Sequence, residues 1–199
     1  NTGGMGTYAP APVMTPALVE AAVKTVLEPM VAAMAAEGSP YQGCLYAGLM
    51  ITDKGPRVVE FNARFGDPET QVVLPLLQSD LAEILLACAE GRLDETDIQW
   101  SDGAAVCVVM ASGGYPGSYK NGLPISGVDA AEKNGALVFH AGTKMADGQL
   151  VTAGGRVLGV VACGKDIVGA QKAAYAAVEQ IHFPDVHYRK DIAWRALKP

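Results

Sequence analysis

The run VVEFNARFGDPETQ at positions 58–71 constrains the fold more than any other part of the sequence. Its first residues alternate apolar and polar, which is typical of a β-strand with one buried face. Side chains two positions apart share a strand face, so Glu60 and Asn62 point the same way, and Arg64 follows if the strand continues. Carboxylate and amide oxygens suit Mg²⁺, and a guanidinium beside the ion stabilises charge on a transferring phosphoryl group. Spacing alone leaves a second interpretation open, in which these residues form a solvated polar face and Arg64 makes an ordinary ion pair.

The residues after this strand resemble a helix start. Asp67 is a candidate N-cap, Pro68 suits the first turn, and Glu69 adds an acidic group near the helix N-terminus. Asp67 and Glu69 are therefore either capping residues or functional carboxylates, and the sequence alone does not decide between them.

Composition limits the classes of protein that remain. Of 199 residues, 50% are hydrophobic and 18% charged, enough to bury the core of one large domain or two small ones. A net charge of −6 argues against non-specific nucleic-acid binding, and no apolar run approaches the roughly 20 residues of a membrane span. We expect a cytoplasmic protein with no nucleic-acid or membrane partner. Four cysteines without a C-x-x-C pair predict reduced, buried thiols, namely Cys44, Cys88, Cys107 and Cys163.

The first half of the chain predicts helices around a β-hairpin. Residues 1–16 are rich in Gly, Pro and Thr and predict an ordered loop, followed by a helix capped by Thr15. That helix carries an apolar stripe expected to lie in the core, and Pro29 should kink or split it. The stripe consists of Val19, Val23, Val26, Met30 and Met34. Strands are predicted at 44–52 and 57–61, and a second helix at 79–90, with Leu81, Ile84, Leu85 and Cys88 on its buried side.

The second half predicts a smaller, β-rich unit. We place the boundary near Trp100, where an acidic segment gives way to the apolar run 104–110. Short strands are predicted at 137–140, 149–152 and 157–162. A closing helix capped by Asp166 runs to about residue 181, and Val168, Tyr175 and Val178 are expected to face inward.

Two glycine-containing segments are candidates for ligand contact. Gly3, Gly4, Met5 and Gly6 can offer backbone amides to an anion, because glycine allows close approach and positive φ. A plain turn explains the same segment. Arg156 follows two glycines and precedes a strand, so it is either a bidentate phosphate ligand or a surface arginine on a hairpin.

These motifs in this order resemble the phosphoribosylamine–glycine ligase family of ATP-grasp enzymes. The resemblance is carried by NTGGMG at positions 1–6, by the run at 58–71, by ASGGYPG at 111–117 and by YRKDI at 188–192. It extends over essentially the whole chain. It implies an α+β fold with residues 1–100 as the C-terminal part of an ATP-grasp domain, an antiparallel sheet with helices. Residues 101–199 would form the family's small β-rich C-terminal domain with one closing helix.

The family's reaction joins the carboxyl group of glycine to the amine of 5-phosphoribosylamine, with ATP as co-substrate. The resemblance implies that Glu60 and Asn62 hold Mg²⁺ or Mn²⁺, and that Arg64 is catalytic. Leu49 would lie at the nucleotide. Gly3, Gly4, Met5, Gly6, Asp67, Glu69 and Arg156 would line the substrate site.

The resemblance also implies a partner, the remainder of the same enzyme N-terminal to Asn1. We therefore expect the isolated 199 residues to fold but to be inactive. Two other hypotheses remain. One is a different ATP-grasp ligase, which would keep the metal strand and change the substrate. The other is a biotinyl- or lipoyl-like carrier modified at Lys144, which precedes a hairpin tip at Asp147-Gly148.

Overall fold

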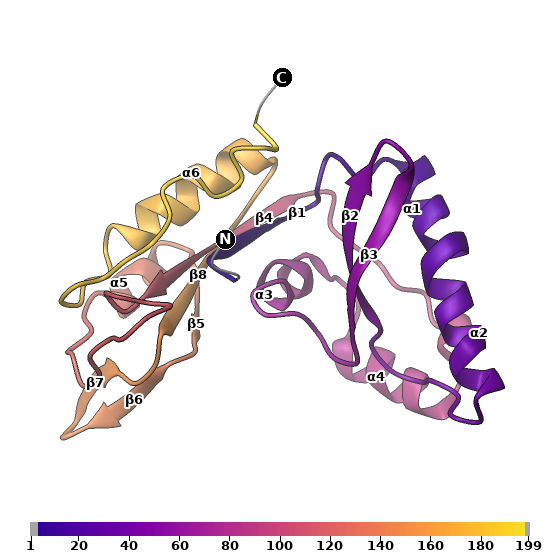
Figure 1. The fold of residues 1–199 in the computed structure, drawn as a ribbon. Helices are drawn as coiled ribbons and strands as arrows, with labels where there is room; N and C mark the ends of the chain where they lie inside the picture. Colours follow the sequence, from indigo (N-terminus) through magenta and orange to yellow (C-terminus); the bar gives the residue numbers. More distant parts are fainter. Residues whose placement is uncertain (1–3, 198–199) are drawn as a thin grey trace. The chain divides into compact units, whose positions relative to one another are not determined.

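A computed structural model describes residues 4–197 of the chain as two compact units (Figure 1). Unit 1 comprises the described residues within Asn1–Pro10, Asp67–Leu76 and Ser101–Pro199, and unit 2 comprises Ala11–Gly66 and Leu77–Trp100. A division between Trp100 and Ser101 is therefore present. Unlike the predicted continuous segments 1–100 and 101–199, however, the units are interleaved, because residues up to 10 and residues 67–76 pack with the C-terminal half.

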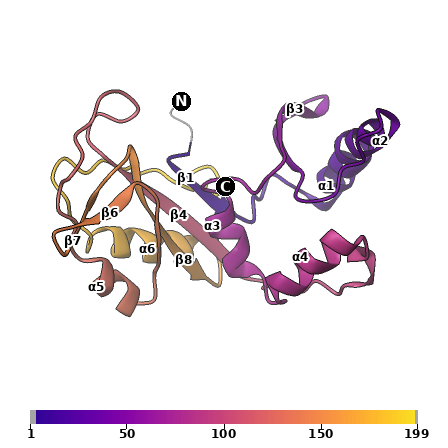
Figure 2. The same cartoon turned by 90° about the horizontal axis from the view of Figure 1, so that it is seen from below.

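Unit 1 is built on a four-stranded antiparallel sheet in the order β1-β4-β8-β5, beside a separate β6–β7 hairpin (Figure 2). Its strands are β1 (Gly6–Ala9), β4 (Ala104–Ala111), β5 (Leu137–His140), β6 (Thr143–Ala146), β7 (Gln149–Thr152) and β8 (Arg156–Gly164). Its helices are α3 (Thr70–Val73), α5 (Val128–Lys133) and α6 (Ile167–Val178), with a 3₁₀ turn η2 at Leu74–Leu76.

Strand β4 is buried along its whole length because both of its faces are covered. On one face Val106, Val108 and Met110 pack in a cluster that includes small residues of α6. On the opposite face Val109 packs in a second cluster with Val72 and Leu76, which belong to α3 and η2. The continuous apolar sequence of β4 follows from this double burial, since neither face needs polar residues.

Unit 1 differs from the sequence prediction in several places. Residues Gly6–Ala9, expected in a loop, form β1 and pair with β4, with Gly6 opposite Val108. The short helix α5 was not predicted. In α6 the buried side chains are mostly alanines, while Val168 is 46% exposed rather than facing inward. The N-cap of α6 is as predicted, since Asp166 Oδ1 accepts a hydrogen bond from the Gly169 amide at 2.7 Å.

Unit 2 contains a β-hairpin and helices. The hairpin joins β2 (Tyr46–Thr52) to β3 (Gly55–Asn62), which confirms the predicted pair of strands. Its helical elements are α1 (Pro16–Ala22), a π-helical segment η1 (Val23–Leu27), α2 (Glu28–Ala36), α4 (Leu81–Glu90) and a 3₁₀ turn η3 (Leu93–Glu95).

The long first helix is interrupted as predicted. The π-helical segment η1 lies directly before Pro29, and the Glu28 amide donates to the carbonyl of Val23, five residues back. Proline has no amide hydrogen, so the regular hydrogen-bond ladder is broken at this point and a wider turn accommodates the break. Thr15 caps the helix, because its hydroxyl accepts from the Leu18 amide at 3.3 Å.

The expected burial of the two helices in unit 2 is largely wrong. In the apolar stripe of the first helix only Val26 is buried, and Val19 is 46% exposed. In α4 the buried residue is Ala87, whereas Leu85 is 47% exposed. Periodicity identified both helices correctly. It did not identify which apolar side chains are covered within this unit.

The helices and cysteines also bear on the classes of protein considered above. Within residues 4–197 no helix is both long and apolar enough to cross a membrane. All four cysteines are free, as predicted, but only Cys107 is buried. Cys163 is exposed, contrary to the expectation of a buried thiol.

The core of unit 1 predicts a contrast between two leucines. Leu158 in β8 is fully buried, whereas Leu137 in β5 is 44% exposed. Replacing Leu158 by Ala leaves a cavity and should lower the free energy of unfolding by about 2–5 kcal/mol. Leu137→Ala, the same chemical change, should cost well under half as much. Denaturant unfolding of both variants measures the difference, and equal losses would contradict this description of the core.

Candidate active site

The hairpin of unit 2 brings Glu60 and Asn62 together. Both lie on β3, where Asn62 pairs with Tyr46 and Glu60 with Gly48. Asn62 Nδ2 donates to Glu60 Oε1 at 3.1 Å, so the two side chains share one face of the strand. A Cβ on Gly48 would lie 3.1 Å from Glu60 Cγ. The absence of a side chain on Gly48 therefore leaves room for the Glu60 side chain beside the neighbouring strand.

This pair offers donor atoms for part of a candidate metal site. The Asn62 amide nitrogen faces Glu60, which leaves the Asn62 carbonyl oxygen as a ligand alongside the second carboxylate oxygen of Glu60. Among the described residues no group of three or more His, Cys, Asp or Glu side chains could hold a metal ion. Mg²⁺ commonly takes one or two protein carboxylates and fills its remaining positions with substrate phosphates and water. The donor set fits an ion of this kind.

Two further predicted residues lie in unit 2. Arg64 follows β3, is exposed, and its Nη1 donates to the carbonyl of the adjacent Phe65 at 2.9 Å. Leu49 lies on β2 directly after a register shift between Gly48 and Leu49, and it is half-buried. Among residues 4–197 Arg64 has no acidic partner, in contrast to the ordinary ion pair considered from the sequence.

In unit 1 the structure brings Gly4, Asp67 and Arg156 together. Arg156 Nη2 contacts Asp67 Oδ2 at 2.7 Å, and Nη1 donates to the backbone carbonyls of Asp67 at 3.0 Å and Gly4 at 3.3 Å. The Arg156 side chain is 25% exposed and that of Asp67 is 50% exposed. One guanidinium thus joins two turns that are 63 positions apart in sequence, because Gly4 and Asp67 share it.

Packing in unit 1 explains this contact. Arg156 is the first residue of β8 and lies opposite Ala111 of β4. Val72 and Leu76 hold the segment 67–76 against the same sheet. Asp67, at the start of that segment, is thereby placed beside the start of β8.

The glycine-rich segment at 3–6 has mixed roles. Gly3 lies outside the described residues. A Cβ on Gly4 would come within 2.3 Å of Arg156 Nη1, and Gly4 has φ +72°, so this position favours glycine on two grounds. Gly6 is explained by packing, since a Cβ there would lie 2.7 Å from the Cys107 carbonyl oxygen. Met5 is buried, and its carbonyl accepts from the Val109 amide at 3.2 Å.

The capping interpretation of Asp67 is wrong. Helix α3 begins at Thr70 and takes Glu69 as its N-cap without a side-chain hydrogen bond, through the Glu69 carbonyl. The Asp67 carboxylate instead accepts from Gln71 Nε2 at 3.1 Å and contacts Arg156. Asp67 therefore serves a tertiary contact and not the helix terminus.

Gln71 was not identified from the sequence. Its Oε1 is buried and has no hydrogen-bond partner among the described residues. Gln71 lines a cavity of about 20 Å³ together with Asp67 and Arg156. A cavity of this size holds about one water molecule, which would satisfy the carbonyl oxygen.

Cys107 lies close enough to Asp67 and Arg156 for their charges to affect the pKa of its thiol. Burial, followed by the negative charge of Asp67, raises the pKa of the Cys107 thiol to about 12. The thiol is therefore protonated at neutral pH.

A second group of polar residues in unit 1 was missed. Tyr115, His187 and Arg189 line a pocket of about 100 Å³ with Met5. Arg189 contacts Asp191 through Nε at 2.8 Å and Nη2 at 2.7 Å, and this pairing lowers the pKa of Asp191. The motifs at 111–117 and 188–192 contained two of the three polar lining residues, Tyr115 and Arg189, but no sequence spacing indicates that they meet.

Two regions of the chain match domains of one ATP-grasp protein family. The ATP-grasp (A) domain of phosphoribosylglycinamide synthetase matches residues 1–70, and the C domain of the same enzyme matches residues 105–195. The chain belongs to the phosphoribosylglycinamide synthetase family. The acidic segment near Trp100 falls between the two matched regions.

Curated relatives support the same assignment. Phosphoribosylamine–glycine ligase of Escherichia coli K12 is 52% identical over 200 residues, which cover 100% of this chain and 47% of that protein. The enzyme of the same name from Agrobacterium fabrum is 51% identical over 99% of this chain and 46% of its own length. The chain thus spans about half the length of these relatives.

Solved structures show the same fold. Phosphoribosylamine–glycine ligase of Thermotoga maritima superposes with a TM-score of 0.85 at 35% identity, covering 97% of this chain and 47% of that one. The biotin carboxylase domain of Hydrogenobacter thermophilus 2-oxoglutarate carboxylase shares the fold with a TM-score of 0.65 at 18% identity, over 98% of this chain and 44% of that one.

The carrier hypothesis is not supported. The predicted hairpin tip at Asp147 and Gly148 is present, and both residues have positive φ. Lys144, however, lies within β6 opposite Val151 and not at the tip.

The Gly4–Arg156 contact yields a matched pair of substitutions. Gly4→Ala introduces a side chain at positive φ and forces Arg156 away from its carbonyl partners. Gly148→Ala imposes a similar backbone strain, at φ +78°, but meets no atom within 4 Å. Each strain costs about 1–2 kcal/mol, and Gly4→Ala should cost about 1 kcal/mol more through lost hydrogen bonds. Denaturant unfolding measures both, and a larger loss for Gly148→Ala would refute the proposed role of Gly4.

Thiol accessibility gives a second prediction. Because the pKa of Cys107 is about 12 and its side chain is buried, its reactive thiolate is almost absent at pH 8 in the folded chain. We expect iodoacetamide to modify exposed Cys163 well before Cys107 under native conditions, and both in denaturant. Peptide mass mapping over time tests this order. Equally fast modification of both native residues would contradict the burial of Cys107.

Proposed function

We propose that the chain forms part of a phosphoribosylamine–glycine ligase that joins glycine to 5-phosphoribosylamine at the expense of ATP. The products are glycinamide ribonucleotide, ADP and phosphate, in purine biosynthesis. The observation that carries the proposal is the match of two of the family's domains, one containing the Glu60–Asn62 pair and the other containing Arg156. We also propose a cytoplasmic location and, as partner, the remainder of the same enzyme.

We assign the phosphoryl-transfer side of the reaction to unit 2. Glu60 and Asn62 would hold Mg²⁺ or Mn²⁺, which supplies charge neutralisation at the ATP phosphates when bound. Arg64 is exposed and, within the described part of the chain, donates only to a backbone carbonyl, so its remaining N–H groups are available to a phosphoryl oxygen. Leu49, on the paired strand, would contribute apolar surface to the nucleotide site.

The chemical role of Arg64 follows from the charge of the reactants. A carboxylate is a poor electrophile, because its negative charge repels an attacking amine. Phosphorylation of glycine converts the carboxylate oxygen into a leaving group, and negative charge develops on the phosphoryl oxygens during transfer and departure. A fixed guanidinium stabilises that charge in the transition state.

We assign the substrate side to unit 1. The Arg156 guanidinium holds the Gly4 turn against the Asp67 turn, and Asp67 is in turn held by Gln71. Asp67 and Glu69 are carboxylates suited to an amine or to ribose hydroxyl groups. The backbone of residues 4–6 borders this cluster at Gly4. Because three hydrogen bonds of Arg156 already go to protein atoms, we assign it primarily to positioning.

The proposal predicts a selective loss of turnover on changing Glu60. A chimera in which these 199 residues replace the matching segment of the E. coli relative should form ADP and glycinamide ribonucleotide from ATP, glycine and phosphoribosylamine. In that chimera Glu60→Gln should lower kcat by about a hundredfold or more, because it weakens the hold on the ion that the chemical step requires. The KM for glycine should change much less.

Glu28→Gln is the matched control. Glu28 is an exposed glutamate of unit 2 on α2, and the same loss of charge there should leave kcat within about twofold. Near-normal kcat for Glu60→Gln at saturating Mg²⁺ and ATP would refute its role as a metal ligand. A folded but inactive chimera with wild-type Glu60 would instead count against the proposed reaction.

A further inference from the structure

The pocket lined by Met5, Tyr115, His187 and Arg189 has the chemistry of an anion site. It measures about 100 Å³ and lies wholly within unit 1. Guanidinium, imidazole and phenol groups all offer hydrogen-bond donors, and no carboxylate is among the described residues that line it. A larger pocket of about 290 Å³ in the same unit is lined by both Lys120 and Asp185, so its charges are mixed.

The walls of the pocket are held in place by contacts on their outer sides. His187 exchanges two backbone hydrogen bonds with Ala111, at 2.7 and 2.8 Å. The hydroxyl of Tyr175, on α6, donates to the Arg189 carbonyl at 2.7 Å and accepts from the Ile192 amide at 3.0 Å. The segment 187–192 is therefore tied both to the sheet and to α6. Donors fixed in this way lose little conformational entropy when a ligand binds.

The side chains of Tyr115 and Arg189 are also constrained. A Cβ on Gly155 would lie 2.3 Å from the Tyr115 ring, so the ring rests directly on the backbone there. The Arg189 guanidinium is oriented by its two contacts with Asp191, which use Nε and Nη2. Nη1 has no recorded partner among the described residues. Asp191 offsets the charge of Arg189. A ligand in this pocket would therefore be held more by directed hydrogen bonds than by net charge.

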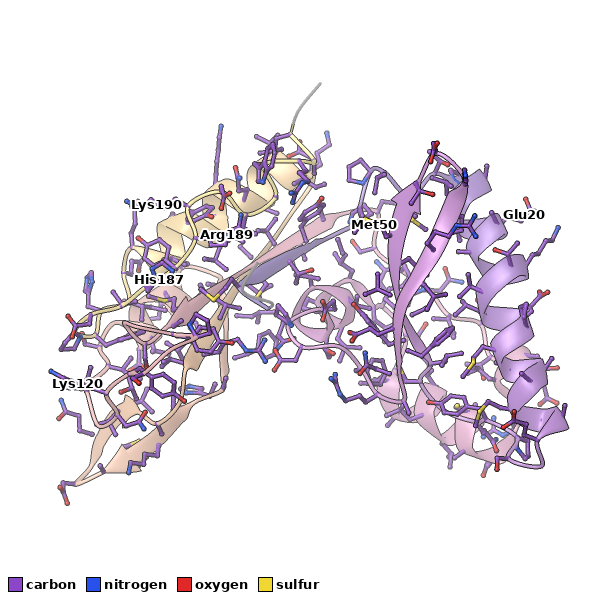
Figure 3. All side chains as sticks on the ribbon, viewed as in Figure 1. Glu20, Met50, Lys120, His187, Arg189 and Lys190 are labelled. Carbon is purple, nitrogen blue, oxygen red and sulfur yellow. The ribbon has the colours of Figure 1, made fainter. Side chains whose placement is uncertain are left out.

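We propose that this pocket binds the phosphate monoester group of the sugar phosphate substrate, an inference that rests on the proposed function. A volume of about 100 Å³ suits a phosphate group and is too small for a nucleotide, since ligand pockets for whole molecules span about 300–1,000 Å³. Met5 follows Gly4, whose carbonyl is bound by Arg156, so the pocket adjoins the Gly4–Asp67–Arg156 cluster. The rest of the sugar would extend toward that cluster. Figure 3 labels His187, Arg189 and Lys190 along the C-terminal segment of unit 1.

The test uses the 199-residue chain without ATP or glycine, so it does not depend on catalysis. Inorganic phosphate, ribose 5-phosphate and ribose are titrated separately and followed by calorimetry or by chemical-shift changes. We expect both phosphates to bind, ribose 5-phosphate more tightly, and ribose not to bind measurably. Tighter binding of ribose 5-phosphate identifies a sugar phosphate, whereas equal affinity for the two phosphates would refute the assignment to the substrate.

Substitutions of two adjacent cationic residues show where ribose 5-phosphate binds. Arg189→Gln removes a lining guanidinium and should weaken ribose 5-phosphate binding about tenfold, the loss expected for one charge-assisted hydrogen bond. Lys190→Gln removes the same charge from a residue that does not line the pocket, and should change affinity by less than about twofold. Equal losses in both variants would mean diffuse surface attraction and would refute the site.

A third variant keeps the inference testable if Arg189→Gln fails to fold. Tyr115→Phe keeps the ring on Gly155 and removes only the hydroxyl, and should weaken ribose 5-phosphate binding about threefold to tenfold. Unchanged affinity in this variant together with unchanged affinity in Arg189→Gln overturns the inference. In the active chimera, Arg189→Gln should raise the KM for phosphoribosylamine more than it lowers kcat. An active chimera with unaltered KM would leave the proposed reaction standing and this inference refuted.

Discussion

The double burial of β4 is the constraint on which the rest of unit 1 depends. One face packs against α6, and the other against Val72 and Leu76 of the segment 67–76. That second contact brings Asp67 to the start of β8, where Arg156 binds it. A hydrophobic contact thus positions a polar cluster. The ion pair is half exposed on the Asp67 side and contributes modestly to stability by itself. Its geometry depends mainly on the buried valine and leucine beneath it.

The two units present different chemistry. In unit 2 a glycine opposite Glu60 gives the carboxylate room beside Asn62, so a carboxylate and an amide side chain lie on one strand face. In unit 1 arginines act through planar, directional contacts with carbonyls and carboxylates. This division suits the reaction proposed above. In that reaction one part would neutralise phosphates during transfer, and another would hold an anionic sugar substrate without competing for the metal.

Local sequence rules predicted the elements better than their burial. The alternation at 58–62 identified β3 and the shared face of Glu60 and Asn62, because a strand's period of two is a backbone property. The proline at 29 predicted the interrupted helix for the same kind of reason. The exposure of Leu85 and the strand at Gly6–Ala9 were missed, since each depends on which distant segment lies alongside. The contact among Gly4, Asp67 and Arg156 was likewise not predicted, although each of the three residues was identified as a candidate site residue.

The pairing of β1 with β4 has a consequence for how the polypeptide reaches its native state. Gly6 lies opposite Val108, so β1 pairs with a strand about a hundred positions later in the sequence. Such non-local pairing carries a large loop-closure cost and slows folding. During synthesis on the ribosome, the hairpin and helices of unit 2 can form before β4 emerges, while β1 stays unpaired. β1 therefore remains accessible to proteases until β4 has been synthesised.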